Sequence, residues 1–455
     1  MPKLRILHTA DWHLGRDLAG VDRTQDFERF LAWLTDEVRT RRPDVLLVAG
    51  DVFNTSMPSN AAQKLYYDFV RKIAETDVAA VIVTAGNHDS AYFLGAARGL
   101  LEGFRCVVSG EGPEDQAVLV KRGGRVLAAV AAVPYLREGD VTLPAGTALD
   151  MDDPAYWRAG VRRHYDRVAA QIDHLLQAEG LDDAAAAAVP RIAMGHLFVT
   201  GEGSADKAVS EAMSHYVGSL RHIGLDAFGP GWAYAALGHV HEAQRIRGSV
   251  PAWYSGAPLT LRFADRNEEP RILEIDITEE GAAEIRSVPV PQPRRILSLS
   301  GDEDALTDAL DALKDEAAVT TMKPVAELVY TGADPAGPAL IDRLQRRADQ
   351  TGVLLGPIRL GGDAARRAAE VEESERISLE EITPEQVFRT VLDARGVEED
   401  VRAPLFARFS EALLEVERDR EAEAEEVAKL LKKNADEGKE QPSAEEEKPQ
   451  PAAEA

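Results

Sequence analysis

Five short apolar segments of this sequence each end in side chains that bind cations or transfer protons. The segments are LRILHTA at 4–10, VLLVAG at 45–50, VIVTAG at 81–86, IAMG at 192–195 and AALG at 235–238. The side chains that follow them are Asp11 and His13, Asp51, Asn87 and His88, His196, and His239 with His241. Ligands of α/β folds gather at the carboxyl ends of strands, so we expect these residues to converge on one edge.

Helical periodicity between the apolar segments sets the fold class. Apolar residues recur at helical spacing in 23–42, and further helices are expected at 60–75 and 159–180. A last strand is expected at 270–278, followed by a proline-rich connector at 287–295. Strands that are almost continuously apolar and alternate with helices predict an α/β sandwich largely enclosed by helices.

Composition narrows the class of protein. A chain of 455 residues with 45% hydrophobic residues is long enough for two or three domains with a large core. Its single cysteine, Cys106, excludes an internal disulfide framework and a thiolate zinc cluster, and it fits a reducing compartment. The N-terminus does not resemble a signal peptide, and no apolar run approaches about 20 residues. We therefore expect a cytoplasmic protein without a membrane partner.

The net charge of −26 argues on its face against a nucleic-acid partner. Many of the Asp and Glu residues, however, lie near the C-terminus, in a stretch whose composition is typical of a solvated helix and a disordered tail. Basic runs remain upstream at 39–42 and 158–164, although each taken alone is typical of a solvated helix face. The average charge therefore does not decide the partner.

Each polar motif is weak by itself, because Asp, Gly and His are common in turns, but the joint pattern is specific. Two divalent ions about 4 Å apart need a bridging carboxylate and further neutral or anionic ligands. Asp51 is the natural bridge. A shell of His, carboxylate and amide without thiolate suits manganese, iron or zinc on ligand type alone. Phosphoester hydrolysis is the reaction that such a pair of ions serves.

The motifs D-x-H, G-D, G-N-H-D, G-H and G-H-x-H, in this order, resemble those of the calcineurin-like metallophosphoesterases. The segments TADWHLG, LLVAGDVFNTS and ALGHVH are similar to sequences of the SbcD family of nuclease subunits, which work with the SbcC ATPase. The resemblance implies a β-sandwich flanked by helices, a smaller α/β capping domain and C-terminal helices. It further implies DNA phosphodiester hydrolysis with two divalent ions, most often Mn²⁺, as a double-strand exonuclease and single-strand or hairpin endonuclease in repair and recombination.

The resemblance also implies a role for each residue of the pattern. One ion would be held by Asp11, His13, Asp51 and His241, and the other by Asp51, Asn87, His196 and His239. His88 would face the scissile phosphate and either stabilise charge or, as a general acid, donate a proton to the leaving oxygen, and Asp89 would support the turn or a ligand. Two positions depart from the family: Asn54 stands where relatives often carry Asp or His, and Glu242 adds negative charge where many carry a basic residue. An Asn54 amide can accept a hydrogen bond from His88 but cannot stabilise an imidazolium as a carboxylate would.

The expected organisation has four parts. They are a nuclease domain at 1–285, an α/β capping domain at 295–378, a helical SbcC-binding segment at 380–432 and an acidic tail at 433–455. Within the cap, one helix is expected at 302–317. The family implies DNA and SbcC as partners, a homodimer within a heterotetramer, and association with the nucleoid. The helix starting at Asn60 is the candidate for the dimer contact.

Two other classes of function stay open from the sequence. One is a stand-alone phosphodiesterase or phosphatase on small substrates, which the cap and the terminal helices disfavour. The other is a scaffold with a structural metal site, which the presence of all the expected ligands disfavours. Comparing the hydrolysis of duplex DNA with that of a nitrophenyl phosphodiester distinguishes a small-substrate phosphodiesterase from a nuclease.

Overall fold

The computed structural model describes residues 3–109, 112, 115–141, 143–144, 154–201, 223–332 and 337–361, with the single residues 402, 405 and 408. The chain divides into two compact units, Met1–Ala365 and Arg366–Ala455. Nearly all described residues belong to the first unit. The rest of the expected helical segment at 380–432, the tail at 433–455 and residues 362–378 of the expected cap lie outside the described residues. Among the helices that are described, none has an apolar stretch that could cross a bilayer.

The first sheet carries three of the five polar strand ends. Its order is β14-β13-β1-β2-β3-β4, with β1 (Leu4–Thr9), β2 (Val45–Ala49), β3 (Ala80–Thr84), β4 (Cys106–Val108), β13 (Arg271–Ile277) and β14 (Ala283–Pro289). Strands β1 to β4 run parallel, whereas β13 and β14 add antiparallel pairs. The ends of β1, β2 and β3 therefore lie at one edge.

The second sheet carries the other two polar strand ends. Its order is β11-β12-β10-β7-β6-β5, with β5 (Ala117–Arg122), β6 (Arg125–Ala132), β7 (Arg191–His196), β10 (Tyr234–Gly238), β11 (Gln244–Ile246) and β12 (Ala252–Tyr254). The pairs β6–β7, β7–β10 and β10–β12 are parallel, and the outer pairs are antiparallel. In register, Gly238 lies opposite His196, so both ends reach the same edge.

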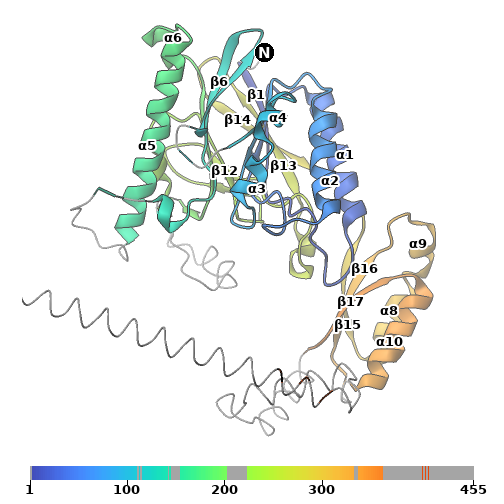
Figure 1. The fold of residues 1–455 in the computed structure, drawn as a ribbon. Coiled ribbons are helices and arrows are strands. Elements are labelled where there is room, and N and C mark those ends of the chain that lie inside the picture. The colour runs from blue at the N-terminus through green and yellow to red at the C-terminus, as the bar shows by residue number, and fades with distance from the viewer. Residues whose placement is uncertain are drawn as a thin grey trace, which may run out of the picture. The chain divides into compact units, whose positions relative to one another are not determined.

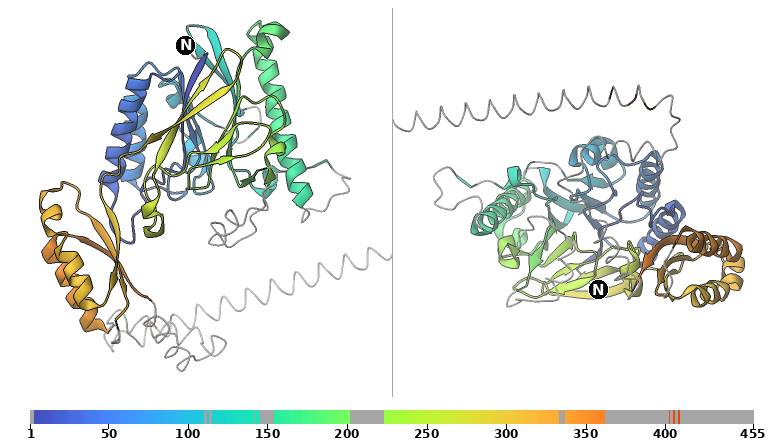
Figure 2. Two further views of the ribbon diagram at one scale, coloured as in Figure 1. Left: turned by 180° about the vertical axis from the view of Figure 1, so that it is seen from behind. Right: turned by 90° about the horizontal axis from the view of Figure 1, so that it is seen from below.

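The two sheets and their helices form four layers (Figures 1 and 2). Helices α1 (Thr24–Arg41) and α2 (Asn60–Ile73) pack on the outer face of the first sheet, and α5 (Pro154–Ala178) packs on the outer face of the second. Helix α2 begins at Asn60 because the Ser59 hydroxyl accepts a hydrogen bond from the Ala62 amide. A third cluster of apolar side chains fills the space between the sheets. The predicted α/β sandwich flanked by helices is confirmed.

Short elements complete this region, and one boundary corrects the sequence prediction. The short elements are α3 (Ala91–Gly95), α4 (Arg98–Glu102), α6 (Asp183–Ala187), β8 (Val199–Thr200), β9 (Ile223–Gly224), and the 3₁₀ turns η2 (Glu138–Asp140), η3 (Leu225–Phe228) and η4 (Phe263–Asn267). The sequence predicted a connector from residue 287, but 287–289 belong to strand β14. They pair with β13, where Arg271 lies opposite Pro289, and this edge position tolerates proline.

A small parallel sheet follows, with the order β15-β16-β17. Its elements are β15 (Ile296–Gly301), α8 (Glu303–Asp311), α9 (Lys314–Val319), β16 (Val325–Tyr330), α10 (Pro338–Thr351) and β17 (Leu354–Leu360). The single helix predicted at 302–317 is wrong, because the chain forms two helices there, with Ala312 and Leu313 between them. Helix α10 ends where Gly352 adopts a left-handed conformation. Apolar residues of α8 and α10 pack on β16 to form a core separate from those above.

A buried ion network fixes the start of α1 to the chain before β15. Both Asp26 oxygens accept hydrogen bonds from Arg294, at 2.6–2.9 Å, and Asp26 Oδ1 also accepts from Arg23 at 3.2 Å. Asp26 is 0% exposed, Arg23 2% and Arg294 9%. One buried carboxylate therefore compensates two buried guanidinium groups.

We expect Asp26→Ala to lower the free energy of unfolding by about 3–5 kcal/mol, because it leaves buried charge without a partner. The matched control on the same helix is Asp36→Ala, which removes the exposed Asp36–Arg39 pair and should cost about 1 kcal/mol or less. Chemical denaturation of both variants beside the parent protein measures the difference. Equal losses in the two variants would contradict the expectation.

Candidate metal centre

Backbone strain concentrates at the polar strand ends. Seven non-glycine residues of the described chain have a positive φ, and four of them are Asp11 (54°), His13 (49°), Asp51 (50°) and His239 (96°). Such conformations are costly for residues with a side chain and persist only where the surrounding structure holds them. These backbone conformations turn the chain at the strand ends, where the four side chains come together between the carboxyl ends of the two sheets.

Asp51 stands at the centre of the assembled group. Its Oδ2 lies 3.6 Å from His13 Nε2 and 3.3 Å from His196 Nε2, while Oδ1 accepts a hydrogen bond from the His88 amide at 2.9 Å. The residue is 1% exposed. One carboxylate oxygen is therefore presented to imidazoles from both sheets.

The remaining side chains form two overlapping clusters around Asp51. Asp11, His13, Asp51 and His241 place one ligand atom each within 4.8 Å of one another, and so do Asp51, His196 and His239. Asn87 joins the second cluster, since its Oδ1 lies 3.1 Å from His196 Nε2 and 2.8 Å from His239 Nδ1. All seven ligand candidates from the sequence thus come together in the two groupings expected.

Close packing of the sheets leaves no space for side chains at two glycines. A Cβ at Gly50 would lie 2.1 Å from His196 Nδ1, and one at Gly238 would lie 1.9 Å from the Ala49 carbonyl oxygen. Because of this approach, His196 Nδ1 donates a hydrogen bond to that carbonyl at 2.8 Å. The bond fixes the ring so that Nε2 faces Asp51.

Asp89 joins the loops that follow β2 and β3. Its carboxylate accepts hydrogen bonds from the amides of Val52, Phe53 and Gly86 at 2.8–3.0 Å, and the residue is 1% exposed. Burial raises the pKa of Asp89 to about 6, and the nearby Asp51 contributes to the increase. These contacts join the loop after β2 to the loop after β3, and Asp89 is not a member of either cluster.

His88 lies beside the clusters but contributes no atom to them. Its Nδ1 lies 3.0 Å from the backbone oxygen of Asn54, which can only accept, so Nδ1 carries a hydrogen and Nε2 is the atom left for exchange. The sequence had assigned this acceptor to the Asn54 side chain. That assignment is wrong, because the Asn54 side chain faces Arg16 instead, with Oδ1 3.4 Å from the guanidinium.

The residues present fit a pair of divalent ions. His13 Nε2 and His241 Nε2 face each other at 3.1 Å, an arrangement in which two neutral rings present lone pairs to a shared point. Burial lowers the pKa of His239 to about 3 and that of His241 to about 4, so both rings are neutral near pH 7. Neutral imidazole, carboxylate and amide oxygen are ligands for first-row divalent metals.

Comparison with known proteins agrees with this geometry. Residues 4–243, more than half of the chain, match the model of the calcineurin-like phosphoesterase family. The SbcD component of the SbcCD nuclease of Rhodobacter capsulatus is 34% identical over 326 residues, which cover 68% of this chain and 75% of the relative. The chain belongs to the SbcD-type calcineurin-like phosphoesterases.

Two further SbcD relatives extend the similarity. The SbcD protein from Escherichia coli K12 is 28% identical over 410 residues, covering 90% of this chain and 98% of the relative. The SbcD protein from Bacillus subtilis is 30% identical over 277 residues, covering 60% and 66%. Binding of divalent metal is typical of the calcineurin-like phosphoesterases, and the buried His/Asp clusters of this SbcD homologue accord with it.

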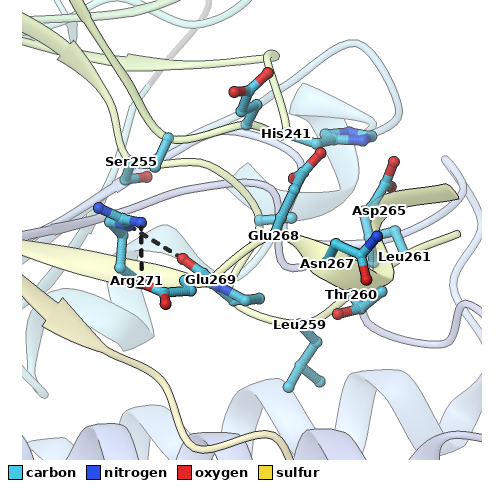
Figure 3. Close-up of a pocket in the computed structure, with 14 residues that line it drawn as sticks. His241, Ser255, Leu259, Thr260, Leu261, Asp265, Asn267, Glu268, Glu269 and Arg271 are labelled. Atoms are coloured by element: carbon cyan, nitrogen blue, oxygen red, sulfur yellow. Dashed lines mark hydrogen bonds and ion pairs between the residues drawn. The ribbon is translucent and has the colours of Figure 1, made fainter. Parts of the chain in front are cut away.

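A pocket of about 370 Å³ opens beside His241 (Figure 3). Four acidic residues line it: Glu242, Asp265, Glu268 and Glu269. Of the nearby arginines, Arg262 pairs with Asp265 at 2.8 Å and Arg271 approaches Glu269 at 3.8 Å. Burial, with Asp265 and Glu242, raises the pKa of Glu268 to about 7. The acidic side chains on this side of the metal centre disfavour binding of a negatively charged phosphate backbone.

His196 gives metal binding a pH dependence. Burial alone would lower its pKa, but the Asp51 carboxylate outweighs burial and raises the pKa of His196 to about 9. At pH 7.5 the metal-free ring is therefore protonated on the nitrogen that faces Asp51 and Asn87. Loading the second cluster requires that proton to leave.

We expect metal binding at pH 7.5 to release about one proton or more, and the affinity to rise about tenfold per pH unit up to about pH 9. Calorimetric titration in buffers of different ionisation enthalpy measures the release. His174→Ala, at an exposed histidine of α5, is the control and should leave the release unchanged. Release close to zero in the parent protein would show that His196 is already neutral.

Proposed function

We propose that this chain hydrolyses DNA phosphodiester bonds with two divalent ions, as the nuclease component of a complex with an SbcC-type ATPase. The observation that carries the proposal is the position of Asp51 Oδ2, which lies within 3.6 Å of imidazole nitrogens from both sheets. A shared carboxylate between two sets of ligands is what a two-metal phosphoesterase requires.

The ligand sets follow from the two clusters. Asp11, His13, Asp51 and His241 would hold one ion, and Asp51, Asn87, His196 and His239 the other. Mn²⁺ is the ion we favour, because mixed imidazole and oxygen ligands without thiolate suit it and the family resemblance implies it. When bound, the ions would polarise the phosphoryl group and lower the pKa of a water molecule.

The chain's own residues would orient the phosphate and move a proton. The ligand candidates Asn87 and His241 and the neighbouring His88 are partly covered or exposed, whereas the other five ligand candidates are buried, so substrate would approach over these three. His88 Nδ1–H stays bonded to the Asn54 carbonyl in both protonation states. Nε2 would then donate its proton to the leaving oxygen as a general acid. Asp89 would hold the Asp51 and Asn87 loops at their spacing.

The other parts of the chain receive roles by similarity. The nuclease region at 1–285 would be followed by a cap at 295–378 that selects DNA, and by a segment at 380–432 that docks on SbcC. The E. coli relative is named as a component of the SbcCD nuclease, which supports an SbcC partner. A homodimer through the region of α2, inside a heterotetramer, is part of the same proposal.

Hydrolysis of two substrates by the metal-loaded full chain tests the proposal. Linear duplex DNA and a nitrophenyl phosphodiester are each incubated with Mn²⁺, with and without an SbcC-type partner. We expect both to be cleaved, and DNA cleavage to depend on the metal. Turnover of the small ester alone, even with the partner, would identify a small-substrate phosphodiesterase. Bound metal without turnover of either substrate would identify a structural site.

A further inference from the structure

Arg16 is a half-buried cation beside the metal clusters. Its amide donates a hydrogen bond to the His13 carbonyl at 2.9 Å, so the side chain starts next to a cluster residue. Its positive charge adds to the effect of burial in lowering the pKa of both His13 and His241. No carboxylate among the described residues forms an ion pair with Arg16.

Two other arginines, Arg262 and Arg23, are paired with carboxylates. Arg262 is held by two bonds to Asp265, at 2.8 and 2.9 Å, and Arg23 is bound to Asp26. Among the described residues, the side chain of Arg16 contacts a neutral group, Asn54 Oδ1, at 3.4 Å. Its charge is therefore not compensated by a carboxylate of the described residues.

Asn54, the residue that contacts Arg16, carries a second donor. A guanidinium carries only donors, so the atom of Asn54 that faces Arg16 must be Oδ1. The carboxamide nitrogen Nδ2 then points elsewhere, and no acceptor among the described residues pairs with it. The backbone oxygen of Asn54 accepts the hydrogen bond from His88 Nδ1. The same residue therefore carries this side-chain nitrogen and positions the proposed general acid.

We propose that the Arg16 guanidinium and the Asn54 carboxamide nitrogen form a phosphate-binding subsite that holds a non-bridging oxygen of the phosphodiester beside His88. The proposal rests on the proposed function and names the residues that position its substrate. It also explains Asn54: an aspartate there would neutralise Arg16 and remove the second donor. Two donors to one non-bridging oxygen would restrict the orientation of the phosphate.

Arg16→Ala in the full chain tests the subsite. We expect kcat/KM for both the nitrophenyl phosphodiester and duplex DNA to fall roughly tenfold to a hundredfold, the effect of losing a charge-assisted hydrogen bond. Binding of inorganic phosphate to the metal-loaded protein, measured by calorimetry, should weaken by a similar factor. Arg16→Lys should recover part of the loss, since it keeps the charge but not the planar fork. The number of bound metal ions should not change.

Arg29→Ala is the matched control, at an exposed arginine of α1. It should leave kcat/KM and phosphate binding within about twofold of the parent. If Arg16→Ala behaves like this control while the parent protein is active, the subsite is wrong and the proposed function stands. Loss of metal ions from Arg16→Ala would also overturn the subsite, because the residue would then be structural. An inactive parent protein would instead overturn the proposed function.

Asn54→Asp tests the electrostatic part separately. It removes the Nδ2 donor in both backgrounds, but the new carboxylate can pair with Arg16 only in the parent background, so the loss of phosphate binding should be larger there than in the Arg16→Ala background. An equal loss in both backgrounds would show that residues 16 and 54 do not act together on the phosphate, and would overturn the subsite. Thermal unfolding of each variant checks that the fold is retained.

Discussion

Asp51→Asn should lower kcat/KM by about a thousandfold or more and reduce the bound metal from two ions to one or none. The substitution keeps the shape of the side chain but removes the charge of the oxygen that faces His13 and His196. Loss of a bridging anion weakens both sets of ligands at once, and several kcal/mol of transition-state stabilisation corresponds to this factor. Elemental analysis of the purified variant gives the metal content, and steady-state hydrolysis gives the rate.

The control for Asp51→Asn is Asp36→Asn, at an exposed carboxylate of α1. It should change neither quantity. A variant at residue 51 that keeps two ions and nearly full activity would remove the basis for a shared ligand. A variant that keeps both ions but loses activity would give Asp51 a role other than holding metal.

His88→Ala should lower kcat for duplex DNA by about 10²- to 10⁴-fold while leaving two ions bound. The side chain contributes no atom to either cluster, and only its backbone amide contacts Asp51. Nitrophenolate is a good leaving group that needs little protonation, so the loss on the nitrophenyl phosphodiester should be clearly smaller. The ratio of the two losses measures the general-acid contribution.

Equal losses on both substrates would contradict the general-acid role and assign His88 to charge stabilisation. His174→Ala, at an exposed histidine of α5, is the control and should leave both rates unchanged. Loss of metal from His88→Ala would show that the imidazole supports the clusters. These outcomes separate His88 from Asp51, which the sequence alone places in the same polar pattern.

The ligand candidates could be found from the sequence because each follows an apolar strand directly. Asp11, Asp51 and His196 occupy positions that local chain direction alone brings to the end of a strand. Parallel pairing then aligns those ends, as the register of β1, β2 and β3 does. Because this pattern depends only on neighbouring residues in the chain, it can be recognised without knowledge of the tertiary fold.

Contacts between segments distant in sequence left no such signal. The bond from His88 to the Asn54 backbone oxygen has no sequence pattern, because every residue has a carbonyl. Arg16 was missed for a related reason: its distance from the ring of His241 depends on loops more than 200 residues apart. The Arg16–Asn54 contact was equally invisible, although an unpaired arginine in the D-x-H-L-G-R stretch could have prompted the question.

The sequence by itself determined the α/β class, the order of the polar strand ends and the types of ligand, because strand periodicity and turn position are local properties of the chain. Only the tertiary structure decided that the ligands come from two facing sheets, that the sheets approach at Gly50 and Gly238, and that Asp51 presents one oxygen to both. It also decided which of the described cations near the centre stay unpaired. These features depend on distances across the space between the sheets, and packing of distant segments sets those distances.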